Sequence, residues 1–142
     1  MKKNKKLVSI IIRTKNEERW ITSCLKNIKK QTYKNYEIII VDNFSDDKTV
    51  EKAKQFKISK VIKIKKFLPG KAINLGIKNS KGDYIVILSA HAIPTNNKWL
   101  ENFVSAIEED KKFAGVYGRQ EPMSFSPASD KRDMLITFGL DR

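Results

Sequence analysis

The chain has 142 residues, of which 40% are apolar and 32% charged, and a formal net charge of +13. This length predicts about one domain, and the composition excludes a collagen-like or disordered chain. No apolar run reaches the roughly 18 residues of a membrane-spanning helix and no secretory signal is evident, so we expect a cytoplasmic chain.

The basic charge does not by itself predict a nucleic-acid partner. Only 5 of the 29 basic residues are Arg. Arg is the side chain best suited to recognising bases and to binding a phosphate through two hydrogen bonds at once. We therefore expect no nucleic-acid binding, and we expect the lysines to form a solvated face. An anionic membrane or substrate surface is the alternative.

Apolar runs and helical spacing alternate along the first half of the chain. A run rich in β-branched residues at 7–13 predicts a strand buried on both faces, and the apolar spacing over 17–31 predicts a helix. A second buried strand is predicted at 36–42. Ser45, followed by two aspartates, is predicted to cap a helix that runs to about Phe56.

The same alternation continues in the second half. The pattern predicts a strand at 60–64, a helix that begins at Pro69, a strand at 84–88, an amphipathic helix after Pro94, a strand at 113–118 and a short helix at 134–138. Strands that alternate with helices indicate an α/β fold, with a doubly wound and mostly parallel sheet.

Cys24 is the only cysteine, which excludes an internal disulfide and a cluster of thiolate metal ligands. It lies on the apolar face of the first predicted helix. We expect a buried and inert thiol there rather than a nucleophile.

Polar clusters follow three of the predicted buried strands, at 13–17, 42–43 and 89–91. In open α/β sheets, ligands bind beyond the carboxyl ends of the strands, where the strand order reverses. The sequence contains neither the Gly-x-Gly-x-x-Gly of dinucleotide-binding folds nor a P-loop, so dehydrogenases of that type and P-loop kinases are excluded.

Four segments together resemble the family 2 inverting glycosyltransferases, whose nucleotide-sugar-binding half has the Rossmann-like GT-A fold with helices on both faces of the sheet. They are VSIIIRTKNE at 8–17, YEIIIVDNFSDDKT at 36–49, GKAINLG at 70–76 and GDYIVIL at 82–88, with Arg13 where proline is more usual. The order and spacing agree from about Leu7 to Gly118. The resemblance implies one domain over 1–142 with a nucleotide-binding core at about 7–118.

The resemblance also implies an activity and several site residues. A sugar would pass with inversion from a UDP- or dTDP-linked donor to a saccharide or lipid-linked acceptor. Thr14, Asn16 and Glu17 are expected to line the nucleotide pocket, and Asp42 to accept a hydrogen bond from uracil or thymine. The alternative for Asp42 is a carboxylate that caps the following turn.

Two basic residues further along the chain also match the family. Lys71 corresponds to a basic position near the nucleotide, and its alternative is a solvated helix lysine. Arg119 lies in a segment, 115–122, that resembles part of some family members, and is a candidate contact for the pyrophosphate or the acceptor. Its alternative is a structural loop arginine.

The sequence departs from the family at 89–91, where Ser-Ala-His stands in place of the usual Asp-x-Asp. The final aspartate of that motif normally binds the divalent cation, so the resemblance makes His91 the expected metal ligand. Imidazole suits Mn²⁺ better than Mg²⁺, so Mn²⁺ is the favoured ion. Ser89 is a candidate contact for ribose or a metal-bound water, and a donor site that works without metal is the alternative.

No residue is marked as the general base that would deprotonate the acceptor. In the family this carboxylate belongs to a later, acceptor-binding half, so we expect it beyond Arg142 and expect the chain to be part of a longer enzyme of cell-envelope polysaccharide synthesis. Peripheral attachment to the inner face of the plasma membrane is a further expectation. The alternatives are a noncatalytic nucleotide-sugar-binding module and a basic surface that binds anionic lipid or nucleic acid.

Overall fold

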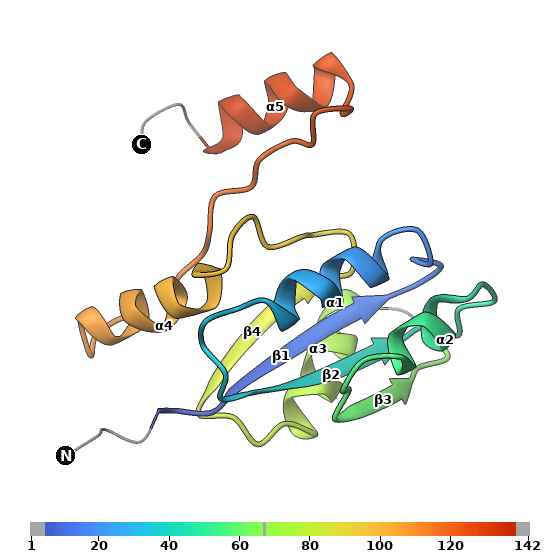
Figure 1. Ribbon diagram of the computed structural model, residues 1–142, viewed down its shortest axis with the longest axis horizontal. Coiled ribbons are helices and arrows are strands. Elements are labelled where there is room, and N and C mark those ends of the chain that lie inside the picture. The colour runs from blue at the N-terminus through green and yellow to red at the C-terminus, as the bar shows by residue number, and fades with distance from the viewer. Residues whose placement is uncertain (1–4, 67, 139–142) are drawn as a thin grey trace. The chain divides into compact units, whose positions relative to one another are not determined.

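The computed structural model describes residues 5–66 and 68–138 (Figure 1). By its internal contacts the chain divides into two compact units, Met1–Val104 and Ser105–Arg142.

The first unit is built on a parallel sheet of four strands in the order β3-β2-β1-β4. The strands are β1 (Val8–Thr14), β2 (Tyr36–Asp42), β3 (Lys60–Lys63) and β4 (Tyr84–Ser89). The helices between them are α1 (Ile21–Lys29), α2 (Thr49–Lys54) and α3 (Pro69–Lys78), and α4 (Trp99–Glu109) follows β4. The predicted α/β fold with a doubly wound parallel sheet is therefore confirmed.

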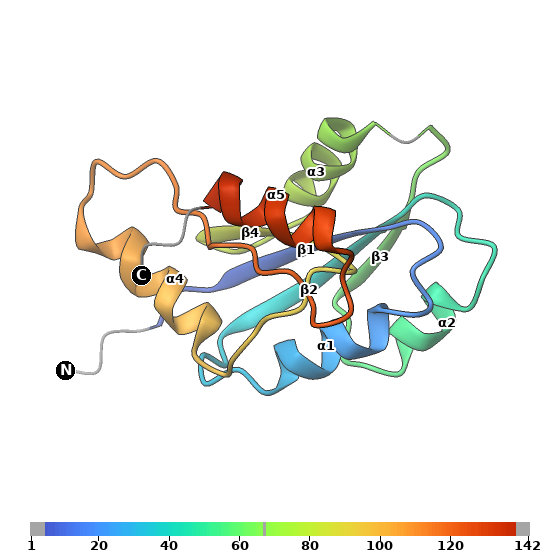
Figure 2. The ribbon, with the colours of Figure 1, turned by 90° about the horizontal axis from the view of Figure 1, so that it is seen from above.

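Helices cover both faces of this sheet because its central strands are apolar on both sides (Figure 2). Val8, Ile10 and Ile12 of β1 pack in one core cluster with residues of α1, α2 and the start of α4. Ile11 faces the other way and packs in a second cluster with Ala72 of α3. The strand β1 is thus buried on both faces, as its continuous run of apolar residues predicts.

The strand order reverses at β1, since the chain moves outward to β2 and β3 and then returns to place β4 on the other side of β1. In the register of the sheet, Arg13 lies opposite Ser89 of β4, and Thr14 lies opposite Asp42 of β2. The polar residues that follow three separate strands therefore meet at one edge of the sheet.

Two details of the predicted elements are wrong. Ser45 does not cap α2, which begins at Thr49, because the Ser45 hydroxyl donates instead to the Asp42 carboxylate. The segment 113–118 is not a strand. Its large side chains Phe113, Val116 and Tyr117 are exposed, and a strand needs a neighbour with which to pair its backbone.

The second unit contains the end of α4 and the helix α5 (Ala128–Phe138). The predicted helix at 134–138 is thus correct in type but begins six residues too late. Within the described residues, no helix combines the length and apolar character that would be needed to cross a bilayer.

Candidate functional site

The loops that follow β1 and β2 are joined by hydrogen bonds. The Asn16 backbone N–H donates to Ser45 Oγ over 3.0 Å, and the Asp46 backbone N–H donates to Asn16 Oδ1 over 3.1 Å. The Glu17 backbone N–H donates to Thr49 Oγ1 over 2.7 Å. Asn16 takes a left-handed conformation with φ of 52°, which a short polar side chain tolerates. These contacts fix the backbone that presents Glu17.

Asp42 lies at the end of β2 and is fully buried. Its Oδ1 accepts hydrogen bonds from the hydroxyls of Thr14, at 2.9 Å, and Ser45, and its Oδ2 accepts one from the Ser45 backbone N–H at 3.0 Å. A carboxylate can accept about four hydrogen bonds, so Oδ2 retains capacity for one more. In this arrangement Asp42 holds the turn after β2 and is linked through Thr14 to β1.

A pocket of about 270 Å³ opens at the edge where the strand order reverses. Its lining residues come from the carboxyl ends of β1 and β4 and the loops after them, and they are Arg13, Thr14, Lys15, Glu17, Ser89 and His91. The structure therefore brings together four of the sequence-predicted residues, Thr14, Glu17, Ser89 and His91. The location agrees with the general rule for ligand sites in open α/β sheets.

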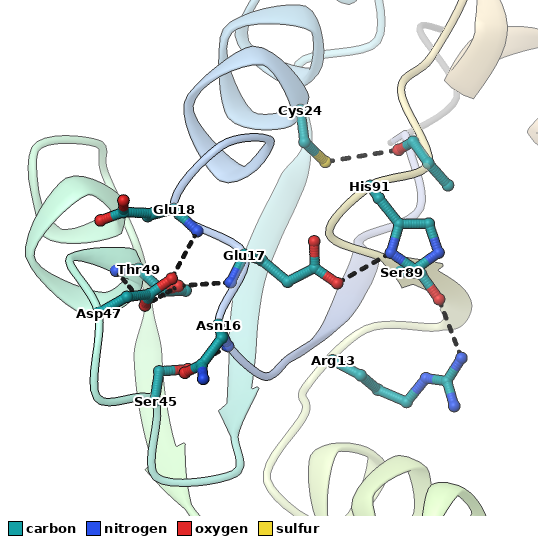
Figure 3. Close-up of polar contacts among 11 residues, drawn as sticks. Arg13, Asn16, Glu17, Glu18, Cys24, Ser45, Asp47, Thr49, Ser89 and His91 are labelled. Carbon is teal, nitrogen blue, oxygen red and sulfur yellow. Dashed lines mark hydrogen bonds and ion pairs between the residues drawn. The ribbon is translucent and has the colours of Figure 1, made fainter. Parts of the chain in front are cut away.

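Glu17 and His91 form a hydrogen-bonded pair in this pocket (Figure 3). The Glu17 Oε1 atom lies 2.9 Å from His91 Nδ1, and the side chains are 17% and 60% exposed, respectively. An ionised carboxylate only accepts hydrogen bonds, so the pair places a proton on Nδ1. In the neutral imidazole this leaves a lone pair on Nε2, which points away from Glu17 in Figure 3.

The pair fits the way in which histidine usually holds a metal. A ligating imidazole commonly donates its other ring N–H to a carboxylate, which fixes the tautomer and the ring orientation. The described residues contain no group of three or more His, Cys, Asp or Glu side chains that could hold an ion. His91 Nε2 is therefore available as one ligand of a divalent cation, and the described residues do not supply a group of further ligands for it.

Arg13 and Ser89 form the other side of the pocket (Figure 3). Arg13 Nη2 donates to Ser89 Oγ over 2.9 Å, while Arg13 Nε is buried and has no hydrogen-bond partner. Lys15 adds a second cation, and its Nζ donates to the Phe44 carbonyl over 2.9 Å. With two cations and the single carboxylate of Glu17, the pocket suits an anionic ligand.

Four predicted site residues, Asn16, Asp42, Lys71 and Arg119, do not line the pocket. Asn16 and Asp42 lie in the hydrogen-bonded loops after β1 and β2. Lys71 is exposed in the first turn of α3. Arg119 belongs to the second unit, is exposed, and has its Nε 3.9 Å from Glu121 Oε1.

Cys24 is buried, as predicted, and its thiol donates to the Ala92 carbonyl over 3.6 Å. Burial, assisted by the negative charge of Glu17, raises the pKa of the Cys24 thiol to about 12. The thiol is therefore protonated at neutral pH, and a protonated thiol is a poor nucleophile.

The sequence places Arg13 and Lys15 in the candidate polar cluster at 13–17 but singles out neither as a site residue, although both line the pocket. The available signal was a charged residue at the end of an otherwise apolar strand, at the edge where ligands of such sheets bind.

Comparison with known proteins gives a consistent result. Residues 9–139 match the family model described as glycosyl transferase family 2. Over 123 residues the chain is 41% identical to a dolichyl N-acetyl-alpha-D-glucosaminyl phosphate 3-beta-D-2,3-diacetamido-2,3-dideoxy-beta-D-glucuronosyltransferase of Methanococcus voltae. The match covers 78% of this chain and 38% of the relative, so the chain spans well under half the length of that protein.

Solved structures with similar folds include known nucleotide-sugar complexes. TarS 1–349 of S. aureus in complex with UDP-GlcNAc has a TM-score of 0.66 and 27% identity, over 82% of this chain and 37% of that one. The mannosyltransferase PcManGT of Pyrobaculum calidifontis, in complex with GDP-Man and Mn²⁺, has a TM-score of 0.67 and 25% identity, over 72% of this chain and 32% of that one.

Proposed function

Since the chain belongs to the family 2 glycosyltransferases, we propose that its first unit binds the nucleoside diphosphate sugar of an inverting sugar transfer. The observation that carries this proposal is the pocket at the ends of β1 and β4, where two cations, a serine hydroxyl and a carboxylate-bound imidazole face the same space. Such a set matches the charge of a diphosphate and offers one ligand for its cation.

The nucleotide is UDP or dTDP in this proposal. The complex of TarS with UDP-GlcNAc supports a uridine donor, and Asp42 supplies the acceptor that a uracil or thymine imide N–H requires. Because Asp42 is fully buried in the turn after β2, contact with a base requires that turn to shift around Ser45. In this proposal Thr14 and Asn16 hold in place the loops beside the nucleobase.

His91 is the proposed ligand of a divalent cation, with Mn²⁺ preferred over Mg²⁺ because the ligand is a nitrogen. When bound, such a cation neutralises negative charge that develops on the diphosphate. Glu17 orients the imidazole, and Ser89 contributes a neutral hydroxyl where an aspartate is usual. The Mn²⁺ in the complex of PcManGT supports a divalent cation at the donor site.

In the transfer step, an acceptor hydroxyl oxygen attacks the anomeric carbon while the bond from that carbon to the diphosphate oxygen breaks, and the electron pair leaves with the diphosphate. A general base takes the hydroxyl proton. We assign this role to none of the described residues. The acceptor is a saccharide or a lipid-linked saccharide, which the dolichyl-phosphate relative supports and which would bring the enzyme to a membrane surface.

The alternative is a noncatalytic nucleotide-sugar-binding module. It is favoured by the neutral Ser89 and by the absence of a multidentate metal site among the described residues. Both candidates bind the donor, but only an organised catalytic centre also breaks the sugar–phosphate bond.

The two are separated by incubating the purified chain with UDP-sugars and Mn²⁺ and measuring UDP release, with and without saccharide acceptors. We expect slow release by hydrolysis and no efficient transfer. Binding with no release supports the noncatalytic module, whereas rapid transfer to an acceptor shows that a residue of this chain serves as the general base.

A further inference from the structure

Arg13, the cation at the end of β1, forms no ion pair with any of the described residues. Its one hydrogen bond, from Nη2 to Ser89 Oγ, is to a neutral hydroxyl, although a guanidinium carries five N–H donors.

This arrangement is unfavourable for the chain alone. Arg13 is half-buried, and its Nε is removed from solvent without a partner. Taking charged and polar N–H groups out of water without a matching acceptor lowers stability. An anion in the pocket would supply the acceptors that the protein lacks, and Arg13 lines that pocket.

The neighbouring residues favour the same ligand. Ser89 is the register partner of Arg13 on β4, so the two side chains lie at the same level of the sheet edge. An aspartate at position 89 would pair with Arg13 and cancel its charge. Serine orients the guanidinium without neutralising it, so the positive charge remains available to a ligand.

We infer that Arg13 is a phosphate-binding residue, which contacts the diphosphate of the donor nucleotide and carries part of the charge neutralisation otherwise left to the metal. The inference rests on the proposed function for its nucleotide ligand. It predicts that this chain keeps measurable affinity for a diphosphate when divalent cations are removed.

The test is calorimetric titration of the full chain with inorganic pyrophosphate, UDP and uridine, all in EDTA. We expect Arg13→Ala to weaken pyrophosphate and UDP binding about tenfold or more, the scale of a lost hydrogen bond to a charged group. Uridine binding should not change, because uridine carries no phosphate. Arg13→Lys should retain part of the affinity, since it keeps the charge without the planar fork.

Arg19→Ala is the matched control, because it removes the same charge from a residue that packs over the Trp20 ring and does not line the pocket. It should leave all three affinities unchanged. If Arg13→Ala does not fold, as judged by circular dichroism, the comparison of Arg13→Gln with Arg13→Lys replaces it. The glutamine keeps a hydrogen-bond donor near Ser89 but loses the charge, and should lose the same affinity as alanine.

The outcomes separate this inference from the proposed function. UDP binding that does not depend on Arg13, or an equal loss of uridine binding in Arg13→Ala, overturns the inference and leaves the nucleotide site in place. Pyrophosphate binding through Arg13 without UDP binding supports the phosphate contact and contradicts the nucleotide function. A wild-type chain that binds neither pyrophosphate nor UDP overturns both.

Discussion

Replacing Glu17 by alanine should weaken Mn²⁺ binding to the chain saturated with UDP, without removing any proposed metal ligand. The Glu17–His91 hydrogen bond, at 2.9 Å, fixes the imidazole with its proton on Nδ1. Loss of such an orienting partner typically lowers metal affinity 10- to 100-fold. Because the His91 side chain is 60% exposed and water replaces part of the lost contact, we expect the lower end, about tenfold or roughly 1.4 kcal/mol.

Free Mn²⁺ is measured by electron paramagnetic resonance during the titration. The tautomer of the His91 imidazole is determined in a separate experiment. His91 is the only histidine, so a chain labelled with ¹⁵N in histidine gives one imidazole to assign. Without metal, the wild type should show protonated Nδ1 and bare Nε2, and Glu17→Ala should lose this preference. Glu51→Ala removes an equal charge from α2 and serves as control. Unchanged Mn²⁺ affinity in Glu17→Ala, or a proton on His91 Nε2 in the wild type, would contradict the orienting role of the Glu17–His91 hydrogen bond.

Three further substitutions test other parts of the account. Gly82→Ala should lower the free energy of unfolding by about 1 to 3 kcal/mol, because the added Cβ would lie 2.5 Å from Ser9 Oγ and 2.6 Å from Ser9 N. An unchanged midpoint of the urea unfolding curve would contradict this close packing. Cys24→Ala should remove a fall in stability with rising pH. The pKa of the Cys24 thiol is 9.0 in the unfolded chain and about 12 in the folded chain, so the unfolded chain loses the proton first. Between these pH values the free energy of unfolding of the wild type therefore falls by up to about 1.4 kcal/mol per pH unit. Parallel curves of stability against pH for the two proteins would contradict this. Asp42→Asn should reduce the preference for UDP over CDP, because only uracil offers an imide N–H to a carboxylate; a preserved preference with lower stability assigns Asp42 to the turn alone.

The sheet was predictable because its strands are marked by unusually continuous apolar runs. The bounds predicted for β2 agree with the structure, those of β3 and β4 differ by one residue at the carboxyl end, and those of β1 differ by one residue at both ends. Each run is bounded by polar residues, and a strand buried on both faces leaves little freedom in its placement. The convergence of the loops after β1 and β4 follows from the parallel sheet and its strand order.

The remaining differences arise where tertiary contacts override local preferences. Ser45 has the side chain of a helix cap, but the buried Asp42 competes for its hydroxyl, and α2 begins only at Thr49. The aspartate that does serve the start of this helix is Asp47. Desolvation raises the pKa of the Asp47 carboxyl, but hydrogen bonds from Thr49 and from the Glu18 backbone outweigh this effect and lower that pKa.

The site was predictable in its location and less so in its charges. The match to the family selects Glu17 and His91, but the sequence does not show that they form a pair, because they are separated by most of the first unit. The sequence does not show the role of Arg13, because that role depends on the lack of a carboxylate partner among the described residues, and a partner can be identified only when β1 and β4 are placed side by side.

The most direct measurement is calorimetric titration of the purified chain with UDP, dTDP and GDP, each with and without Mn²⁺. We expect selective binding of one pyrimidine diphosphate, strengthened by Mn²⁺ in the wild type and not in His91→Ala. Equal affinity for GDP, or no binding of any of the three, would contradict a nucleotide-sugar site at the ends of β1 and β4.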